Sequence, residues 1–154
     1  MARTERVENK TYDHGSIEIR IGGIKYDGVR SYTFSQKRTR GIVRGQGRSR
    51  APKAKTSGMV DVGELSINVD KQDALRIRQD LALRASDVSY GNASVTITIQ
   101  ATEPGLPNHV DEFTGCTLDE ESGGSDENSV DPLVEDIKFG FLEMTRNGLK
   151  LGAR

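Results

Sequence analysis

Apolar and polar residues alternate over several stretches of this chain, which is typical of half-buried β-strands. The alternation is clearest over residues 95–100, where Val95, Ile97 and Ile99 share one face. The other stretches with this pattern are 17–21, 31–44, 59–69, 113–118 and 133–145. Within 59–69 the phase of the alternation changes at Gly63, which predicts a β-bulge there. The chain is therefore predicted to be mainly β.

A single stretch has helical periodicity instead. Ala74, Ile77, Leu81 and Ala85 fall on one face of a helix over residues 71–84. Asp70 precedes it, and an Asp in that position is a favourable N-cap. Turns are predicted at residues 22–23, 90–92 and 147–148, with a short edge strand over 149–154.

These elements predict one domain, residues 1–154, built as a small β-barrel or sandwich with one flanking α-helix and long loop arms. The arms are an N-terminal arm over residues 1–15, an extended basic loop over 40–58 and an acidic loop over 117–132. Only 34% of residues are hydrophobic and 5% aromatic, and there is no Trp. This composition favours a small hydrophobic core, in a fold that is stabilised in part by contacts with neighbouring subunits.

The charges are sorted into two blocks although the whole chain has a formal net charge of only −1. Residues 37–55 contain basic side chains and no acidic ones, and residues 111–136 the reverse. Two such blocks can complement each other within a chain or between copies. The basic candidates for a subunit interface are Arg38, Arg40, Arg44, Arg48, Arg50, Lys53 and Lys55. The acidic candidates are Asp119, Glu120, Glu121, Glu135 and Asp136.

The residues that could support catalysis or metal binding are few. His14 and His109 lie in predicted loops without Cys or His partners at ligand spacing, so solvated loop histidines are expected. Cys116, the single cysteine, lies near carboxylates that raise a thiol pKa, and is expected to be a small apolar strand residue. We therefore expect no catalytic residues, no metal, no cofactor and no enzyme activity.

The basic segment 37–55 allows a second hypothesis, a small nucleic-acid-binding β-domain, since eight cations could neutralise several phosphates. The segment has no aromatic residue on which bases could stack. A protein partner is therefore favoured.

Three further features concern the compartment. A lone cysteine favours a reducing environment. The polar N-terminus is not typical of a secretory signal. No apolar run reaches the length of a membrane span, so no membrane insertion is expected.

The order of the segments carries a resemblance to a known family. The segments are the turn at residues 23–28, the basic Gly-rich stretch 41–50, the Ser57-Gly58 entry into a strand, Phe113–Cys116, and the closing strand 137–141 that leads to Asn147-Gly148. In this order, from about residue 16 to 148, they resemble tail tube proteins of contractile-tailed bacteriophages, which share their architecture with type VI secretion tube proteins. The acidic loop is longer than in a minimal tube protein.

The resemblance implies a structural role. Six copies would form a ring, and stacked rings would make a hollow conduit for DNA delivery inside a contractile sheath. The loop at 40–58 would reach neighbouring subunits. The implied partners are other copies of the chain, the tail sheath protein, the baseplate, and the tape-measure protein and DNA in the lumen. The implied location is the tail of the virion, after assembly in the host cytoplasm.

Overall fold

The computed structural model describes residues 17–44, 52–56, 58–86, 89–125, 127 and 133–151. The predicted N-terminal arm, residues 1–15, lies outside this part of the chain. The strands before the helix are β1 (Ile17–Ile21), β2 (Ile24–Lys25), β3 (Val29–Ser35), β4 (Arg38–Thr39), β5 (Ile42–Arg44), β6 (Pro52–Lys55), β7 (Met59–Val60) and β8 (Gly63–Asp70). The elements that follow are helix α2 (Lys71–Ala85), a 3-10 turn (Tyr90–Asn92), β9 (Val95–Ala101), β10 (His109–Gly123), β11 (Val134–Phe141), β12 (Glu143–Arg146) and β13 (Leu149–Lys150).

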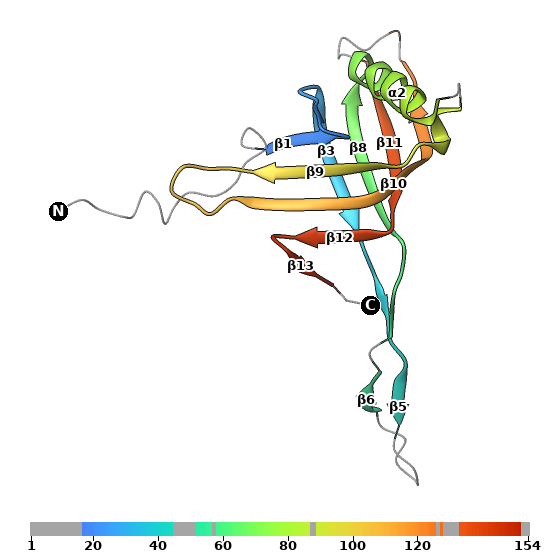
Figure 1. Ribbon diagram of the computed structural model, residues 1–154. Helices are drawn as coiled ribbons and strands as arrows, with labels where there is room; N and C mark the ends of the chain where they lie inside the picture. The colour runs from blue at the N-terminus through green and yellow to red at the C-terminus, as the bar shows by residue number, and fades with distance from the viewer. Residues whose placement is uncertain are drawn as a thin grey trace, which may run out of the picture.

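Nine of the described strands form one antiparallel sheet in the order β2-β1-β9-β10-β11-β8-β3, with β12 and β13 branching from β10. The first half of β10 pairs with β9 and β12, and its second half pairs with β11. Gly115 lies between the halves with a φ of 68°, a conformation that glycine adopts without steric cost. The sheet therefore folds over on itself, and its two parts cross (Figure 1). This confirms the prediction of a mainly β fold with one flanking helix.

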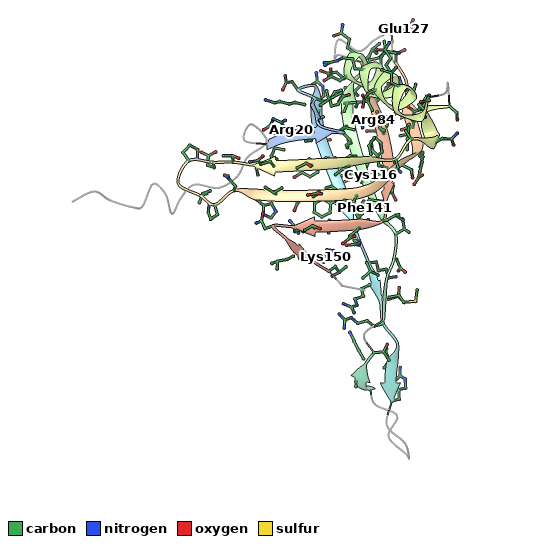
Figure 2. The ribbon with its side chains drawn as sticks, viewed as in Figure 1. Arg20, Arg84, Cys116, Glu127, Phe141 and Lys150 are labelled. Carbon is green, nitrogen blue, oxygen red and sulfur yellow. The ribbon has the colours of Figure 1, made fainter. Side chains whose placement is uncertain are left out.

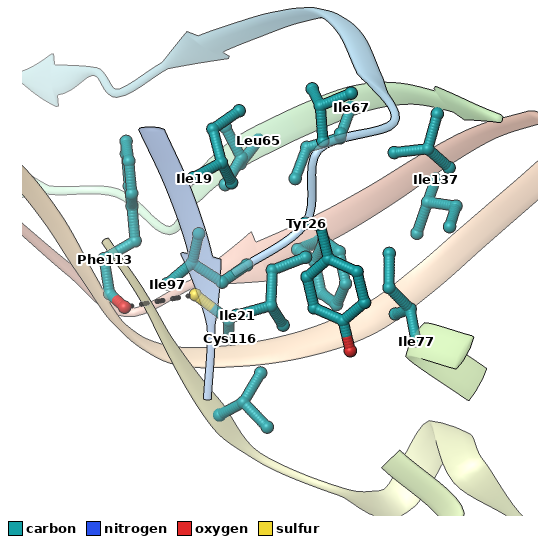
Figure 3. Packing of buried hydrophobic residues seen from close by; sticks show 14 of the residues in the cluster. Ile19, Ile21, Tyr26, Leu65, Ile67, Ile77, Ile97, Phe113, Cys116 and Ile137 are labelled. Atoms are coloured by element: carbon teal, nitrogen blue, oxygen red, sulfur yellow. Dashed lines mark hydrogen bonds between the residues drawn. The ribbon is translucent and has the colours of Figure 1, made fainter. Parts of the chain in front are cut away.

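The core lies between the two crossing parts of the sheet and the helix (Figure 3). In β8 every second side chain is fully buried, at Leu65, Ile67 and Val69, as the alternation predicts. Phe113 packs edge-to-face against Phe141, with 4.9 Å between the ring centroids. Few aromatic residues thus fill the centre of the fold.

Helix α2 forms as predicted and buries Ala74, Ile77 and Leu81. The capping prediction is wrong in its mechanism, because the Asp70 side chain makes no cap hydrogen bond and instead accepts one from Arg30 Nε at 2.7 Å. Asp73 Oδ2 accepts a hydrogen bond from the Gly28 backbone N–H at 2.6 Å, which ties the first helical turn to the residue before β3. Among the described residues, no helix is long and apolar enough to cross a bilayer.

Three predicted strands have the wrong bounds. The predicted strand 31–44 is three strands, β3, β4 and β5, which pair with β8, β7 and β6 respectively. The predicted strand 59–69 is two strands, because β7 pairs with β4 while β8 pairs with β3 and β11. The chain changes its pairing partners between residues 60 and 63, and that change reverses the alternation without a bulge. The predicted strand 133–145 is likewise broken at Leu142, where the chain passes from pairing with β8 and the second half of β10 to pairing with the first half of β10.

The predicted acidic loop is also partly a strand. Residues 117–123 belong to β10 and pair with β11 from Thr117↔Gly140 to Gly123↔Glu135. These residues are mostly polar because this part of the sheet exposes one face to solvent. They therefore lack the alternation of apolar and polar residues that predicts a strand. Residue 126 and residues 128–132 lie outside the described part of the chain.

Candidate functional site

The described part of the predicted basic loop is a β-hairpin arm, defined here as residues 37–44, 52–56 and 58–61. Its strands pair as β4 with β7 and β5 with β6. Between these pairs, the Thr56 N–H donates to the Gly41 carbonyl at 2.8 Å, and the Gly41 N–H donates to Thr56 Oγ1 at 2.8 Å. The arm projects well away from the sheets (Figure 1). The prediction of a loop over 40–58 failed because β5 and β6 are short and contain too few apolar residues to show the alternation of a half-buried strand.

The basic candidates that the structure describes lie along this arm. Arg38, at its base, donates from Nη1 to the Leu151 carbonyl at 3.1 Å. Arg40, Arg44 and Lys55 are exposed further along the arm. Lys53 lies in β6. Arg48 and Arg50 lie outside the described residues. The arm thus carries several cations beyond the surface of the body.

Two of the acidic candidates share one cation within the subunit. Arg78, on helix α2, donates from Nε to Glu121 Oε1 and from Nη2 to Glu135 Oε2, both at 2.6 Å. Tyr90 donates its hydroxyl hydrogen to the other oxygen of Glu121, also at 2.6 Å. The side chains of Arg78 and both glutamates are about a quarter exposed or less, at 23%, 26% and 17%. This cluster fastens helix α2 to β10 and β11.

Burial raises the pKa of the Glu121 carboxyl, but the hydrogen bonds from Tyr90 and Arg78 and the positive charge of Arg78 outweigh it, so that the pKa ends below its ordinary value. A carboxylate held in this way stabilises the folded state. The sequence offered no signal for the cluster, because Arg78 lies 43 residues from Glu121 and 57 from Glu135.

The other acidic candidates lie on or beside the polar outer face of β10, β11 and β8. Glu120 lies 3.6 Å from Lys138 Nζ, and Asp136 accepts a hydrogen bond from Asn68 at 2.7 Å. Asp119 accepts one from Thr117 at 3.2 Å. These side chains are more exposed to a neighbour than Glu121 and Glu135 are. Their role at an interface stays a prediction.

The histidine prediction needs a correction. His109 begins β10 and is part of a cluster in which its Nε2 lies 3.3 Å from Asp111 Oδ1. The Asp111 side chain is 3% exposed and also accepts from Arg146 Nε at 3.0 Å. Arg146 lies over the Phe34 ring, 5.1 Å from its centroid. The cluster joins β10, β12 and β3, and among the described residues no group of three His, Cys, Asp or Glu side chains could hold a metal ion.

Cys116 is fully buried, as predicted for an apolar strand residue. Its thiol donates to the Phe113 carbonyl at 3.3 Å (Figure 3). Burial raises the pKa of this thiol to about 12, so that burial and not the neighbouring carboxylates is the cause. A thiol in this setting is a poor nucleophile.

Replacing Arg78 with Ala is expected to lower the free energy of unfolding by about 1–3 kcal/mol, because two partly buried carboxylates would lose their cation. Urea unfolding followed by circular dichroism measures the change. Arg20→Ala is the control, since the exposed Arg20–Glu18 pair should contribute only about 0–1 kcal/mol. Equal effects of the two substitutions would contradict the assignment.

Acid should weaken the same cluster. Because the pKa of Glu121 is lower in the folded state than in the unfolded chain, its stabilising contribution is present above about pH 4.3 and is lost as the pH falls through the folded value. Glu121→Gln should therefore lose stability at pH 7 and show a weaker dependence of stability on pH between 5 and 3. Identical pH profiles for both proteins would rule out this role of Glu121.

Comparisons with known proteins address the fold as a whole. No protein-family model matches this sequence, and no curated protein matches it. The structure is similar to a chain from the sheath–tube complex, in its extended state, of the extracellular contractile injection system PVC. The TM-score is 0.69 and the sequence identity 11%, over 95% of this chain and 97% of that one.

A chain from the tube-terminating cap of the anti-feeding prophage has a TM-score of 0.67 and 11% identity, over 90% of this chain and 91% of its own. Hcp1 from Flavobacterium johnsoniae has a TM-score of 0.54 and 11% identity, over 89% of this chain and 98% of its own. The chain therefore has the tube-protein fold that contractile injection systems share with Hcp.

Proposed function

We propose that this chain is a structural subunit of the tube of a contractile injection system. Six copies close into a ring, and rings stack into a hollow conduit inside a contractile sheath. The observation that carries the proposal is the similarity to a chain of a sheath–tube complex over almost the full length of both proteins. A sheath and a baseplate are the expected partners, since similar chains occur in structures of a sheath–tube complex and of a baseplate.

The hairpin arm supports an assembly role. An isolated two-stranded hairpin is only marginally stable in water. In this chain the pairs β4–β7 and β5–β6 have no third strand among the described residues. A neighbouring subunit would supply the missing contacts, and the exposed cations would fix its position through the acidic residues of that neighbour.

A contact between unlike surfaces of two copies is the kind that closes rings or extends filaments. An arm on one subunit and an acceptor surface on the next form such a contact. Individual exposed ion pairs contribute about 0–1 kcal/mol each. Charge would therefore determine the register, and apolar and backbone contacts would supply most of the affinity.

In its narrower form the proposal places the chain in the tail of a bacteriophage, with DNA and a tape-measure protein in the lumen. The order of segments along the sequence supports this form. Tubes isolated from the native source would then contain DNA that is protected from nuclease. Tubes that contain only protein cargo would favour a secretion or toxin-delivery system.

Sedimentation velocity of the purified protein over a range of concentrations and salt tests the assembly role. We expect large species that grow with protein concentration. A monomer under every condition would contradict the proposal. If that monomer bound DNA at low salt and released it at high salt, the nucleic-acid hypothesis for residues 37–55 would replace it.

A further inference from the structure

Exposed apolar side chains gather at two ends of the described structure. Beside the base of the arm lie Met59, Leu142, Leu149 and Leu151, with exposures of 75%, 61%, 75% and 45%. On helix α2 lie Leu75 and Leu83, with exposures of 53% and 79%. Figure 1 shows the helix at one end of the molecule and the arm at the other, and Figure 2 labels Arg84 on the helix and Lys150 in β13, beside the base of the arm.

The surface beside the arm is a groove with two hollows of about 750 and 710 Å³. Gln36, Met144, Lys150 and Leu151 line both hollows, so that Gln36 lies between them. The first hollow extends to Met59 and Leu142. The second extends to Phe34 and Leu149.

Gln36 carries an unsatisfied acceptor at this point. Its side-chain Oε1 is buried and has no hydrogen-bond partner among the described residues. Leaving a buried acceptor unpaired costs about 1–3 kcal/mol. Because Gln36 lines both hollows, a rotation of its side chain toward the groove would bring this oxygen to a donor of a second molecule and remove that cost.

The exposed face of helix α2 has a matching arrangement. Leu75, Gln79 and Leu83 are exposed and spaced four residues apart, so they lie on one stripe of the helix. The two leucines are separated by about 12 Å along the helix axis. Between them Gln79 presents a side-chain amide with two N–H donors.

We propose that helix α2 of one copy docks into the groove of the next. Leu75 and Leu83 enter the two hollows, and Gln79 donates a hydrogen bond to Gln36 Oε1. An amphipathic helix in an apolar groove is a common mode of recognition. The inference rests on the proposed assembly role and specifies which surfaces meet. Because the helix and the groove lie on opposite sides of the folded body, the contact repeats head to tail, as stacked rings require.

A pair of introduced cysteines tests this contact in the full chain. The double variant Gln36→Cys/Gln79→Cys should form disulfides between copies under mild oxidation. The native thiol of Cys116 should not interfere, since it is buried with a pKa raised to about 12. A bridge within one copy is not expected, because β3 runs away from helix α2 (Figure 1) and Gln36 follows the far end of β3, whereas a disulfide needs Cα atoms within about 7 Å.

The expected result is a ladder of covalent oligomers on a non-reducing gel for the double variant. Each single-cysteine variant should stay monomeric on the gel, and an equimolar mixture of the two should stop at dimers. Leu75→Ser/Leu83→Ser should also weaken assembly at least tenfold in sedimentation, while its unfolding curve stays close to that of the parent protein.

Four results would overturn the inference. Assembly of the double variant without cross-links would reject this contact and leave the proposed function standing. Cross-linking of Gln79→Cys alone would show that helices meet helices. Full assembly of Leu75→Ser/Leu83→Ser, with binding of a sheath protein lost, would make the sheath the partner of α2. If the wild-type chain does not assemble, both the proposed function and this inference fail.

Discussion

Replacing Phe113 with Ala is expected to lower the free energy of unfolding by about 3–5 kcal/mol, a large part of the stability of a small domain. The Phe113 side chain is fully buried. Its ring packs against Phe141, and against Phe34 at 5.5 Å between centroids. Since Phe113 lies where β10 passes from one part of the sheet to the other, an Ala would leave a cavity that neither part can close.

Urea unfolding of the two proteins under identical conditions measures this loss. Leu142→Ala is a matched control, because Leu142 follows β11 directly but is 61% exposed and should change the stability of the monomer by less than about 1 kcal/mol. A loss below about 1 kcal/mol for Phe113→Ala would mean that Phe113 is not at the centre of the core.

Reversing three charges on the arm should have the largest effect on assembly. In the variant Arg40→Glu/Arg44→Glu/Lys55→Glu, a basic arm becomes acidic and would meet the carboxylates of its neighbour with repulsion. We expect assembly to weaken by roughly tenfold or more, which corresponds to about 1.4 kcal/mol or more per contact. The stability of the monomer should change little, since these side chains are exposed.

Sedimentation at matched concentration and salt compares this variant with the parent protein. Arg20→Glu/Lys25→Glu is the control, because it reverses two exposed charges on β1 and β2 away from the arm. Equal weakening in both variants would indicate a general effect of net charge. Unchanged assembly of the arm variant would remove the arm from the interface.

The sequence predicted those elements whose pattern is local. Ile19 and Ile21 of β1 and the buried face of helix α2 follow directly from the spacing of apolar residues, and both have the predicted burial. The Asn147-Gly148 turn has positive φ at both residues, 51° and 81°, as its dipeptide predicts. In these elements neighbouring residues along the chain carry the information.

Features that depend on distant residues could not be predicted in this way. The second half of β10 is a strand because β11 pairs with it, although its own side chains read as a loop. Arg78 is important because Glu121 and Glu135 reach it from two other strands. Asp70 is positioned to cap the helix but binds Arg30 instead, 40 residues away along the chain. These strand pairings and side-chain contacts are determined by packing between elements that are distant in the sequence.

The candidate site was likewise predicted only in those parts that depend on neighbouring residues. A segregated charge pattern identified the basic segment, and the structure presents that segment as a projecting hairpin. The pattern did not separate acidic residues that are partly buried in an ion-pair cluster, such as Glu121, from the exposed ones, such as Glu120 and Asp136. That distinction requires the position of Arg78.

Electron microscopy of the purified full-length protein tests the central claim most directly. Negatively stained particles should show rings with a central hole and six-fold symmetry in end view, and striated tubes of constant diameter in side view. Particles of monomer size alone, at every protein concentration and ionic strength, would contradict the claim that this chain builds a tube.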